Sequence, residues 1–324
     1  MAYSPEVLSR ARFRLAEEKA AREQEFTRHK AIAYEKSPRL AEIDRQLSVT
    51  VAQAVALSFQ KGEDTTAAIE KLKQENLSLQ QERAAILAAF GEGYLDNTPI
   101  CDRCGGTGYV GETMCECLGE LCRQEQKKEL TQLLSAGNAR FEQFRLDVYS
   151  DRYNDSFGCS PRQMQQLILN RCQRYTRDFA PDSGNLLFSG APGLGKTFLS
   201  ACIARGVANR GYSVVYETAI KLFSAFEAAK FGDYSQENQE KTEKYLKCDL
   251  LIIDDLGSEM TTQLTMSALY TVVNTRLMEG LSTIISTNLT AEAIKSRYTP
   301  AICSRILGMY QLMQFLGDDL RLSQ

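Results

Sequence analysis

A glycine-rich segment of eight residues, Gly190 to Thr197, restricts the possible folds of this chain more than any other feature. Its sequence is GAPGLGKT. It follows the apolar run NLLF (185–188) and precedes FLSACIARG, a segment that is expected to form a helix. Glycine permits backbone conformations closed to other residues, so successive N–H groups can converge on phosphate oxygens at a helix N-terminus. The pattern G-x-x-x-x-G-K-[ST] between a strand and a helix predicts a nucleotide phosphate-binding loop within an α/β domain.

Each end of this loop has an expected task. Lys196 should reach the β- and γ-phosphates of ATP, and the Thr197 hydroxyl should bind Mg²⁺. The alternative is a glycine-rich turn that binds nothing. That alternative does not explain why an expected strand directly precedes the loop and an expected helix directly follows it. The residues expected to bind the nucleotide are Gly190, Ala191, Pro192, Gly193, Leu194, Gly195, Lys196, Thr197, Phe198 and Asp254.

A second motif lies about sixty residues further along the chain. The apolar run Leu250–Ile253 ends in Asp254 and Asp255. Such a run predicts a buried strand that carries two carboxylates to the carboxyl edge of the sheet, where ligands bind in open α/β folds. We expect Asp254 to hold Mg²⁺, directly or through water, and Asp255 to polarise the attacking water.

Short apolar runs alternate with helical segments throughout this part of the chain. The runs are 185–188, 213–216, 249–253 and 282–286, and a helix is expected from Pro161 to about Phe179. This alternation is typical of a parallel sheet with helices on both faces.

The first 95 residues are predicted to be helical. Ser4-Pro5 and Ser37-Pro38 each place a capping hydroxyl before a proline at the first helical position. Two series of positions then step alternately by three and four residues, as in a coiled coil. They are Leu40, Ile43, Leu47, Thr50, Ala54, Leu57 and Ile69, Leu72, Asn76, Leu79, Arg83, Ile86, Phe90.

The break at Lys61-Gly62-Glu63-Asp64 between the two series favours an antiparallel helical hairpin. Asn76 and Arg83 stand at seam positions where apolar residues are usual. Two amphipathic helices packed on a neighbour therefore remain an equal alternative.

Four of the ten cysteines lie within seventeen residues, in the segment CDRCGGTGYVGETMCEC. Cys101, Cys104, Cys115 and Cys117 have the spacing C-x2-C…C-x-C, and glycines between them allow tight turns. The chain's one histidine is His29, so we expect a structural Zn²⁺ site with four thiolate ligands. An iron–sulfur cluster or unmetallated thiols are the alternatives.

Composition excludes some classes of protein. The formal net charge of −3 excludes a strongly basic nucleic-acid protein, although a local basic groove stays possible. Lys221, Lys230 and Arg276 are candidates to line a pore, or belong to ordinary solvated helix faces. The absence of a long apolar stretch and the charged N-terminal sequence predict a cytoplasmic protein that has no membrane partner.

With these motifs in place, residues 141 to 321 resemble the AAA+ ATPases, and specifically the DnaC/IstB-like branch. This branch includes bacterial replicative helicase loaders of the DnaC/DnaI type and transposition helper ATPases. The resemblance is carried by GAPGLGKT, by LLIIDDLGSE (250–259), by STN (286–288), by SRI (304–306) and by the lead-in FEQFRLDVY (141–149).

The resemblance implies roles for three further residues. Asn288 would be the sensor 1 residue that orients the attacking water, and its alternative is a capping asparagine. Arg305 would be an arginine finger donated to the ATP site of a neighbouring subunit, so that the chain self-associates through that site. No full C-terminal lid is expected after Arg305, and Arg321 is a weak candidate for sensor 2.

The expected organisation is a helical coiled-coil partner-binding domain (1–97), a four-cysteine zinc module (98–122), a linker and lead-in segment (123–160) and an AAA+ ATPase domain (161–324). The expected function is an ATP-hydrolysing replication protein that loads or remodels the hexameric replicative helicase and binds single-stranded DNA. The alternatives are a transposition helper ATPase acting on duplex DNA, and a nucleotide-gated protein adaptor.

Overall fold

The computed structural model describes residues 3–58, 64–133, 139–231 and 236–321, and the chain divides into two compact units. One unit comprises Met1–Arg12 and Glu116–Gln324, and the other comprises Phe13–Cys115. The division therefore lies inside α1 (Pro5–Lys36) and directly before α4 (Glu116–Leu133). Helix α4 crosses position 122, where the sequence predicted the end of the cysteine module. The four domain boundaries given above stay predictions.

The larger unit is built on a five-stranded parallel sheet with the strand order β4-β5-β6-β3-β7. The strands are β3 (Asn185–Ser189), β4 (Val214–Thr218), β5 (Leu250–Leu256), β6 (Ser282–Thr287) and β7 (Tyr310–Gln314). The four apolar runs are thereby confirmed as strands. Strand β7 was missed because it lies at the sheet edge, where Gln311 and Leu312 are exposed and interrupt the apolar pattern.

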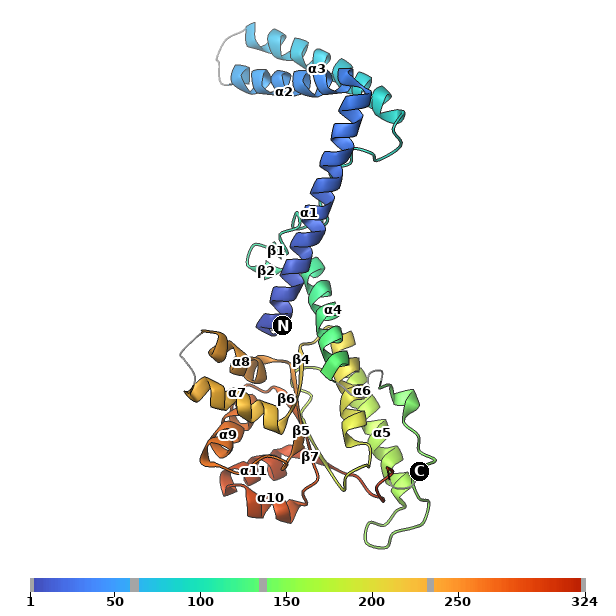
Figure 1. Ribbon diagram of the computed structural model, residues 1–324, viewed down its shortest axis with the longest axis vertical. Coiled ribbons are helices and arrows are strands. Elements are labelled where there is room, and N and C mark those ends of the chain that lie inside the picture. Colours follow the sequence, from blue (N-terminus) through green and yellow to red (C-terminus); the bar gives the residue numbers. More distant parts are fainter. Residues whose placement is uncertain (1–2, 59–63, 134–138, 232–235, 322–324) are drawn as a thin grey trace. The chain divides into compact units, whose positions relative to one another are not determined.

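Helices cover both faces of this sheet (Figure 1). On one face lie α5 (Pro161–Arg177) and α6 (Lys196–Asn209). The other face carries α7 (Ala219–Phe231), α8 (Gln236–Lys247), α9 (Gln263–Met278), α10 (Ala291–Arg297) and α11 (Pro300–Met309).

Alternate residues of each central strand enter opposite cores. In β5, Leu250 and Ile252 pack in the core with α5 and α6, while Leu251 and Ile253 pack in the other. Both faces are buried, which is why these strands read as unbroken apolar runs. The predicted α/β fold with a helix-sandwiched parallel sheet is confirmed. Among the described residues, β7 is followed by turn residues and no helix.

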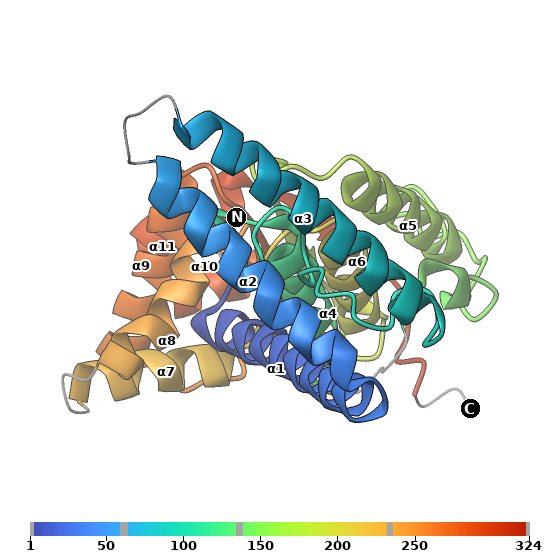
Figure 2. The same ribbon diagram turned by 90° about the horizontal axis from the view of Figure 1, so that it is seen from above.

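The smaller unit contains most of α1, then α2 (Pro38–Ser58), α3 (Asp64–Ala88) and the two-residue strands β1 (Tyr109–Val110) and β2 (Thr113–Met114). Helix α2 begins at Pro38, directly after the capping serine that predicted it. Figures 1 and 2 both show α2 and α3 side by side. The helical N-terminal region is confirmed.

The predicted seam is the shielded face of this helix pair. Leu40 and Ile43 are fully buried, and the seam positions of α3 are less exposed than most of their neighbours. The two polar seam residues have partners, since Asn76 Nδ2 donates to Thr50 Oγ1 at 3.0 Å and Arg83 Nε donates to Asp44 Oδ1 at 2.7 Å.

The two helices thus contact one another along the predicted seam, and the partner-binding role of the hairpin stays a prediction. The side chain of Leu57 and the break at residues 61–63 lie outside the described residues.

No helix in the described part of the chain is long and apolar enough to cross a membrane.

Candidate functional site

The glycine-rich loop connects β3 to α6, as its pattern predicted. Gly193 and Gly195 both adopt positive φ, of 75° and 86°, which disfavours any side chain there. At Gly195 a Cβ atom would also lie 2.8 Å from the Phe144 ring. The lead-in segment that carries Phe144 therefore packs directly on the loop. From the same segment, the Tyr149 hydroxyl donates to the Leu194 carbonyl at 3.0 Å.

Lys196, the first residue of α6, is 7% exposed. Its ammonium group donates to the carbonyls of Gly190 and Ala191 and to Asn288 Oδ1, each at 2.7 Å. These bonds use all three N–H groups of an ammonium. Burial lowers the pKa of Lys196 to about 8, and the nearby carboxylates of Asp254 and Asp255 oppose this effect. At neutral pH the side chain is therefore charged, as phosphate binding requires.

Asp254, at the carboxyl end of β5, is 6% exposed and has both carboxylate oxygens hydrogen-bonded. Its Oδ1 accepts from Ser286 Oγ and from Thr197 Oγ1, the latter at 3.4 Å. Its Oδ2 accepts from the hydroxyl of Tyr216 at 2.5 Å. The side chains of Asp254 and Thr197 thus meet, and their oxygen atoms are of the type that Mg²⁺ prefers.

Asp255 is exposed and has a φ of 57°, the one positive φ at a non-glycine residue in the described part of the chain. Its backbone N–H donates to Ser286 Oγ at 3.1 Å, and its side chain accepts from Asn288 Nδ2 at 3.0 Å. A left-handed conformation costs energy outside glycine and is found disproportionately at functional sites. In this conformation the Asp255 carboxylate contacts Asn288.

The strand order explains why Asn288 contacts both motifs. Strand β6 lies between β3 and β5, and Asn288 directly follows it. Parallel strands place their carboxyl ends at one edge, so a side chain after the middle strand is flanked by those after its neighbours. Asn288 accordingly bridges Lys196 and Asp255.

These residues surround one cavity of about 530 Å³, a size that suits a nucleotide. Its lining residues are Pro192, Gly193, Leu194, Gly195, Lys196, Thr197, Phe198, Thr218, Asp254, Asp255, Ser286, Asn288 and Arg321. Gly190 and Ala191 line an adjoining hollow of about 870 Å³ instead. The cavity offers a lysine, a helix N-terminus and carboxylates, so the residues present fit ATP with Mg²⁺.

Arg321 lines this cavity, although its chain segment follows the edge strand β7. The residues before Arg321 pack on the glycine-rich loop: a Cβ atom at Gly193 would overlap Asp319, and one at Gly190 would overlap Phe315. The Arg321 N–H donates to Asp319 Oδ1 at 3.0 Å, which closes a local turn. The sensor 2 role of Arg321 stays a prediction.

Arg305 lies on α11 and is not among the residues that line the nucleotide cavity of its own chain. Its guanidinium lies 4.6 Å from the centre of the Tyr270 ring and donates to Asn274 Oδ1 at 2.9 Å and to the Tyr270 hydroxyl at 3.1 Å. The structure therefore does not bring Arg305 together with Lys196 and Asp254 within one chain.

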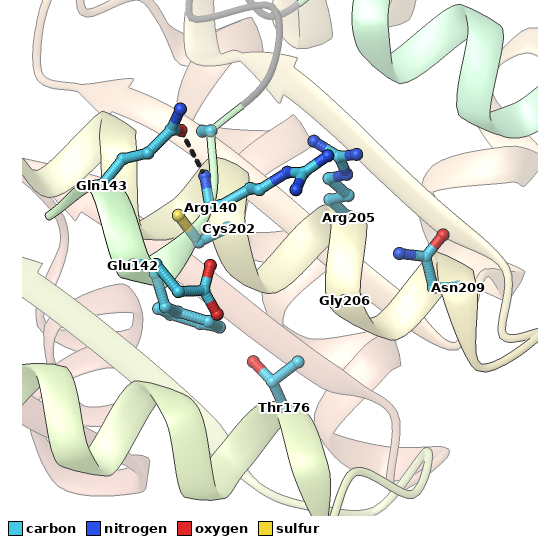
Figure 3. A pocket seen from close by; sticks show the side chains of 10 residues that line it. Arg140, Glu142, Gln143, Thr176, Cys202, Arg205, Gly206 and Asn209 are labelled. Atoms are coloured by element: carbon cyan, nitrogen blue, oxygen red, sulfur yellow. Dashed lines mark hydrogen bonds between the residues drawn. The ribbon is translucent and has the colours of Figure 1, made fainter.

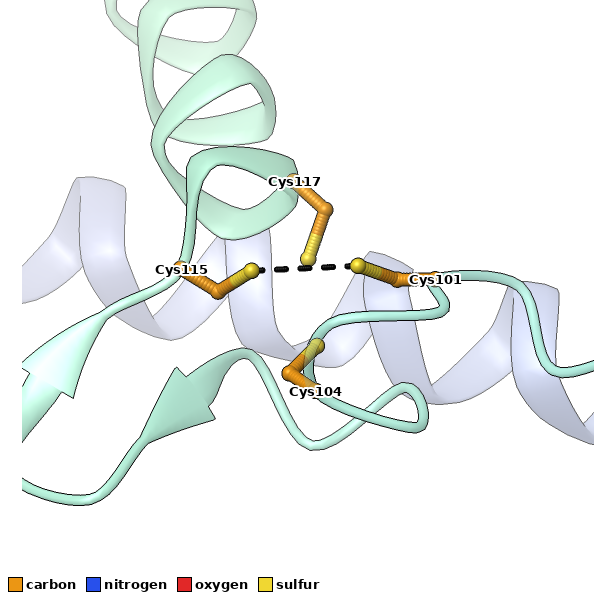
Figure 4. A group of neighbouring side chains, drawn as sticks. All are labelled: Cys101, Cys104, Cys115 and Cys117. Carbon is orange, nitrogen blue, oxygen red and sulfur yellow. Dashed lines mark hydrogen bonds between the residues drawn. The ribbon is translucent and has the colours of Figure 1, made fainter.

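The four clustered cysteines converge (Figure 4). Their sulfur atoms all lie within 4.8 Å of one another, and Cys101 Sγ and Cys115 Sγ are 3.7 Å apart. A Zn–S bond of about 2.3 Å in a tetrahedron places sulfur atoms roughly 3.8 Å apart, so the cluster fits Zn²⁺. Cys104 Sγ also accepts from the Gly108 N–H at 3.3 Å. Cys122 is buried and lies outside the cluster.

The structure corrects one suggestion from the sequence, at Arg276, and shows one contact that the sequence did not indicate, at Tyr216. Arg276, a candidate to line a pore, is fully buried and donates to Thr283 Oγ1 and to backbone carbonyls, so it has a structural role. Tyr216 was missed as a site residue, because a tyrosine within a strand carries no sequence signal of its contact with Asp254.

A separate cavity of about 670 Å³ lies between the lead-in segment, α5 and α6 (Figure 3). Its lining includes Arg140, Glu142, Thr176, Arg205 and Asn209 and none of the residues predicted to bind nucleotide.

Comparisons with known proteins identify a family and several similar proteins. The family model described as IstB-like ATP binding protein matches residues 118–324. The "Uncharacterized protein YdaV" of Escherichia coli (strain K12) is 28% identical over 142 residues, which are 44% of this chain and 56% of that protein. The "Replicative helicase loader DnaC" of Buchnera aphidicola subsp. Acyrthosiphon pisum (strain APS) is 25% identical over 158 residues, which are 48% of this chain and 64% of that protein.

The chain thus spans less than two thirds of the length of either relative. Among solved structures, the crystal structure of the DnaC helicase loader is similar to 54% of this chain, with 98% of that chain covered, 22% sequence identity and a TM-score of 0.43.

Proposed function

Because this chain belongs to the family of IstB-like ATP-binding proteins, we propose that it is an AAA+ ATPase that loads or remodels a hexameric replicative DNA helicase. The observation that carries the ATPase part is the convergence of Lys196, Thr197, Asp254 and Asn288 on one cavity. The similarity to replicative helicase loaders named DnaC supports the replication part.

In this proposal each residue of the cavity has a separate task. Lys196 leaves the loop carbonyls and binds the β- and γ-phosphates, while Thr197 and Asp254 hold Mg²⁺. When bound, Mg²⁺ neutralises the charge that develops on the phosphates. Asp255 polarises the attacking water, and Asn288 orients it.

Self-association belongs to the same proposal. Arg305 is absent from the cavity lining of its own chain, and its guanidinium is held on α9 by Tyr270 and Asn274. A planar guanidinium held in this way suits donation to the γ-phosphate of a neighbouring subunit.

We assign partner binding to the helical hairpin of α2 and α3. Val51 and Val55 of α2 lie one helical turn apart and are 56% and 53% exposed. Adjacent exposed apolar side chains are a feature of protein-binding surfaces. In this proposal the four-cysteine module binds Zn²⁺ and has a structural role. We also propose that the protein binds single-stranded DNA and is located in the cytoplasm.

The test is co-elution of the full chain with the replicative helicase of the same organism on size-exclusion chromatography, with and without ATP. We expect a stable complex, and we expect the double substitution Val51→Asp, Val55→Asp to abolish it. Met278→Asp is the matched control, since Met278 is 80% exposed but lies on α9 of the other unit. A complex that survives the double substitution would refute the hairpin assignment.

If no complex with the helicase forms in any condition, the proposed helicase-loading function is refuted. The second candidate is a transposition helper ATPase that acts on duplex DNA, a role compatible with membership of the IstB-like ATP-binding family. ATP-dependent filaments on duplex DNA, together with no helicase binding, would establish it. If nucleic acid changes neither the ATPase rate nor assembly, a nucleotide-gated protein adaptor is the function.

A further inference from the structure

Tyr216 makes a contact with the nucleotide site that the roles above do not use. It lies on β4, next to β5 in the sheet, with Tyr216 paired to Ile252 and Thr218 paired to Asp254. Tyr216 is 6% exposed and does not line the nucleotide cavity. Its hydroxyl donates to Asp254 Oδ2 at 2.5 Å, the length of a strong charge-assisted hydrogen bond.

The two oxygens of Asp254 therefore have different surroundings. Oδ2 points to Tyr216, whereas Oδ1 meets the hydroxyls of Ser286 and Thr197 and the N–H of Asp255. A carboxylate turns easily about its last torsion angle, so one fixed oxygen decides where the other points. The Tyr216 bond keeps Oδ1 directed at Thr197, the side of the carboxylate that belongs to the cavity.

We propose that Tyr216 is a positioning residue, which fixes the Asp254 carboxylate so that one oxygen is presented for Mg²⁺ beside Thr197. The inference rests on the proposed ATPase function, because Asp254 and Thr197 are metal ligands only there. Tyr216 acts through Asp254 and touches neither nucleotide nor metal. Residues that orient metal-binding carboxylates commonly change metal affinity by about 10- to 100-fold when they are removed.

The variant Tyr216→Phe removes the donor and keeps the ring. Binding of N-methylanthraniloyl-ATP to the full chain is measured by fluorescence at increasing Mg²⁺ concentration and in EDTA. Direct Mn²⁺ binding is followed by electron paramagnetic resonance in the presence of nucleotide. We expect unchanged affinity in EDTA and an approximately tenfold higher metal concentration at half-saturation.

Tyr175→Phe is the matched control. Tyr175 is 5% exposed in the same core, and its hydroxyl also donates a hydrogen bond, to the Gly184 carbonyl at 2.9 Å. Both variants should unfold at a lower temperature than the wild type, but only Tyr216→Phe should shift the metal dependence. In an Asp254→Ala background, Tyr216→Phe should have no further effect on metal binding.

Three results would overturn the inference: a wild-type metal dependence in Tyr216→Phe, an equal shift in Tyr175→Phe, or a loss of nucleotide affinity in EDTA that shows a merely structural role. Failure of the proposed function itself is distinguishable, because the wild-type chain would then bind no ATP at any Mg²⁺ concentration.

Discussion

Lys196 is held in a way that prepares it for phosphate. Its three N–H groups donate to two loop carbonyls and Asn288, and in the proposed function phosphate oxygens would take the place of the loop carbonyls. Burial makes this charge costly in the free protein and lowers the pKa of Lys196 to about 8, from an ordinary value of 10.5. ATP brings negative charge to the same place, so the bound state favours the protonated lysine.

The consequence is a pH dependence of ATP binding. Above pH 8 the free protein loses the Lys196 proton and must take it up again to bind ATP, so affinity should fall by roughly tenfold for each pH unit above 8. Calorimetric titration between pH 7 and pH 9 measures this. Lys196→Ala should bind about 30-fold more weakly at pH 7, as expected for the loss of about 2 kcal/mol, and should lack the fall. A wild-type affinity that is constant from pH 7 to pH 9 would contradict the expectation.

Among the elements, the cysteine segment has the least support from ordinary secondary structure. Strands β1 and β2 contain two residues each, and a hairpin of that size is not stable by itself in water. What brings the segment together is the convergence of Cys101, Cys104, Cys115 and Cys117. Metal binding and local folding should therefore be one event.

Metal analysis of the chain purified under reducing conditions checks this element. We expect about one zinc per chain in the wild type and a large loss in Cys104→Ser, with faster proteolysis between residues 98 and 117. Cys122→Ser is the control, because Cys122 is buried but outside the cluster, and its zinc content should be unchanged. Zinc near zero in the metal-replete wild-type protein would exclude the module.

At the scale of the whole molecule, Arg305 does not line the cavity of its own chain. The proposed active form is therefore an oligomer in which Arg305 reaches the ATP site of a neighbouring subunit. Arg305→Ala should keep ATP binding and lose hydrolysis by about 10³-fold or more, if the guanidinium acts on the neighbouring subunit. A phosphate-release assay measures the rate. Arg177→Ala is the control, since Arg177 is an exposed arginine at the end of α5.

Mixing separates the assembled form from a single-chain mechanism. Arg305→Ala and Lys196→Ala chains should each be inactive alone, but together they should recover part of the activity, because one supplies the intact cavity and the other the arginine. Wild-type hydrolysis by Arg305→Ala alone would reject the role of this residue.

Local patterns in the sequence were enough to predict the glycine-rich loop and four of the five described strands of the main sheet. They also predicted the cluster of four cysteines and the seam of the helical hairpin. Each depends on residues close together in the chain or on a simple period of burial. Contacts between distant segments decided the rest. The edge strand β7, the burial of Arg276, the position of Asn288 between Lys196 and Asp255, and the bond from Tyr216 to Asp254 all depend on the order of strands in the sheet. That order follows from packing across the whole domain, which no short stretch of sequence contains.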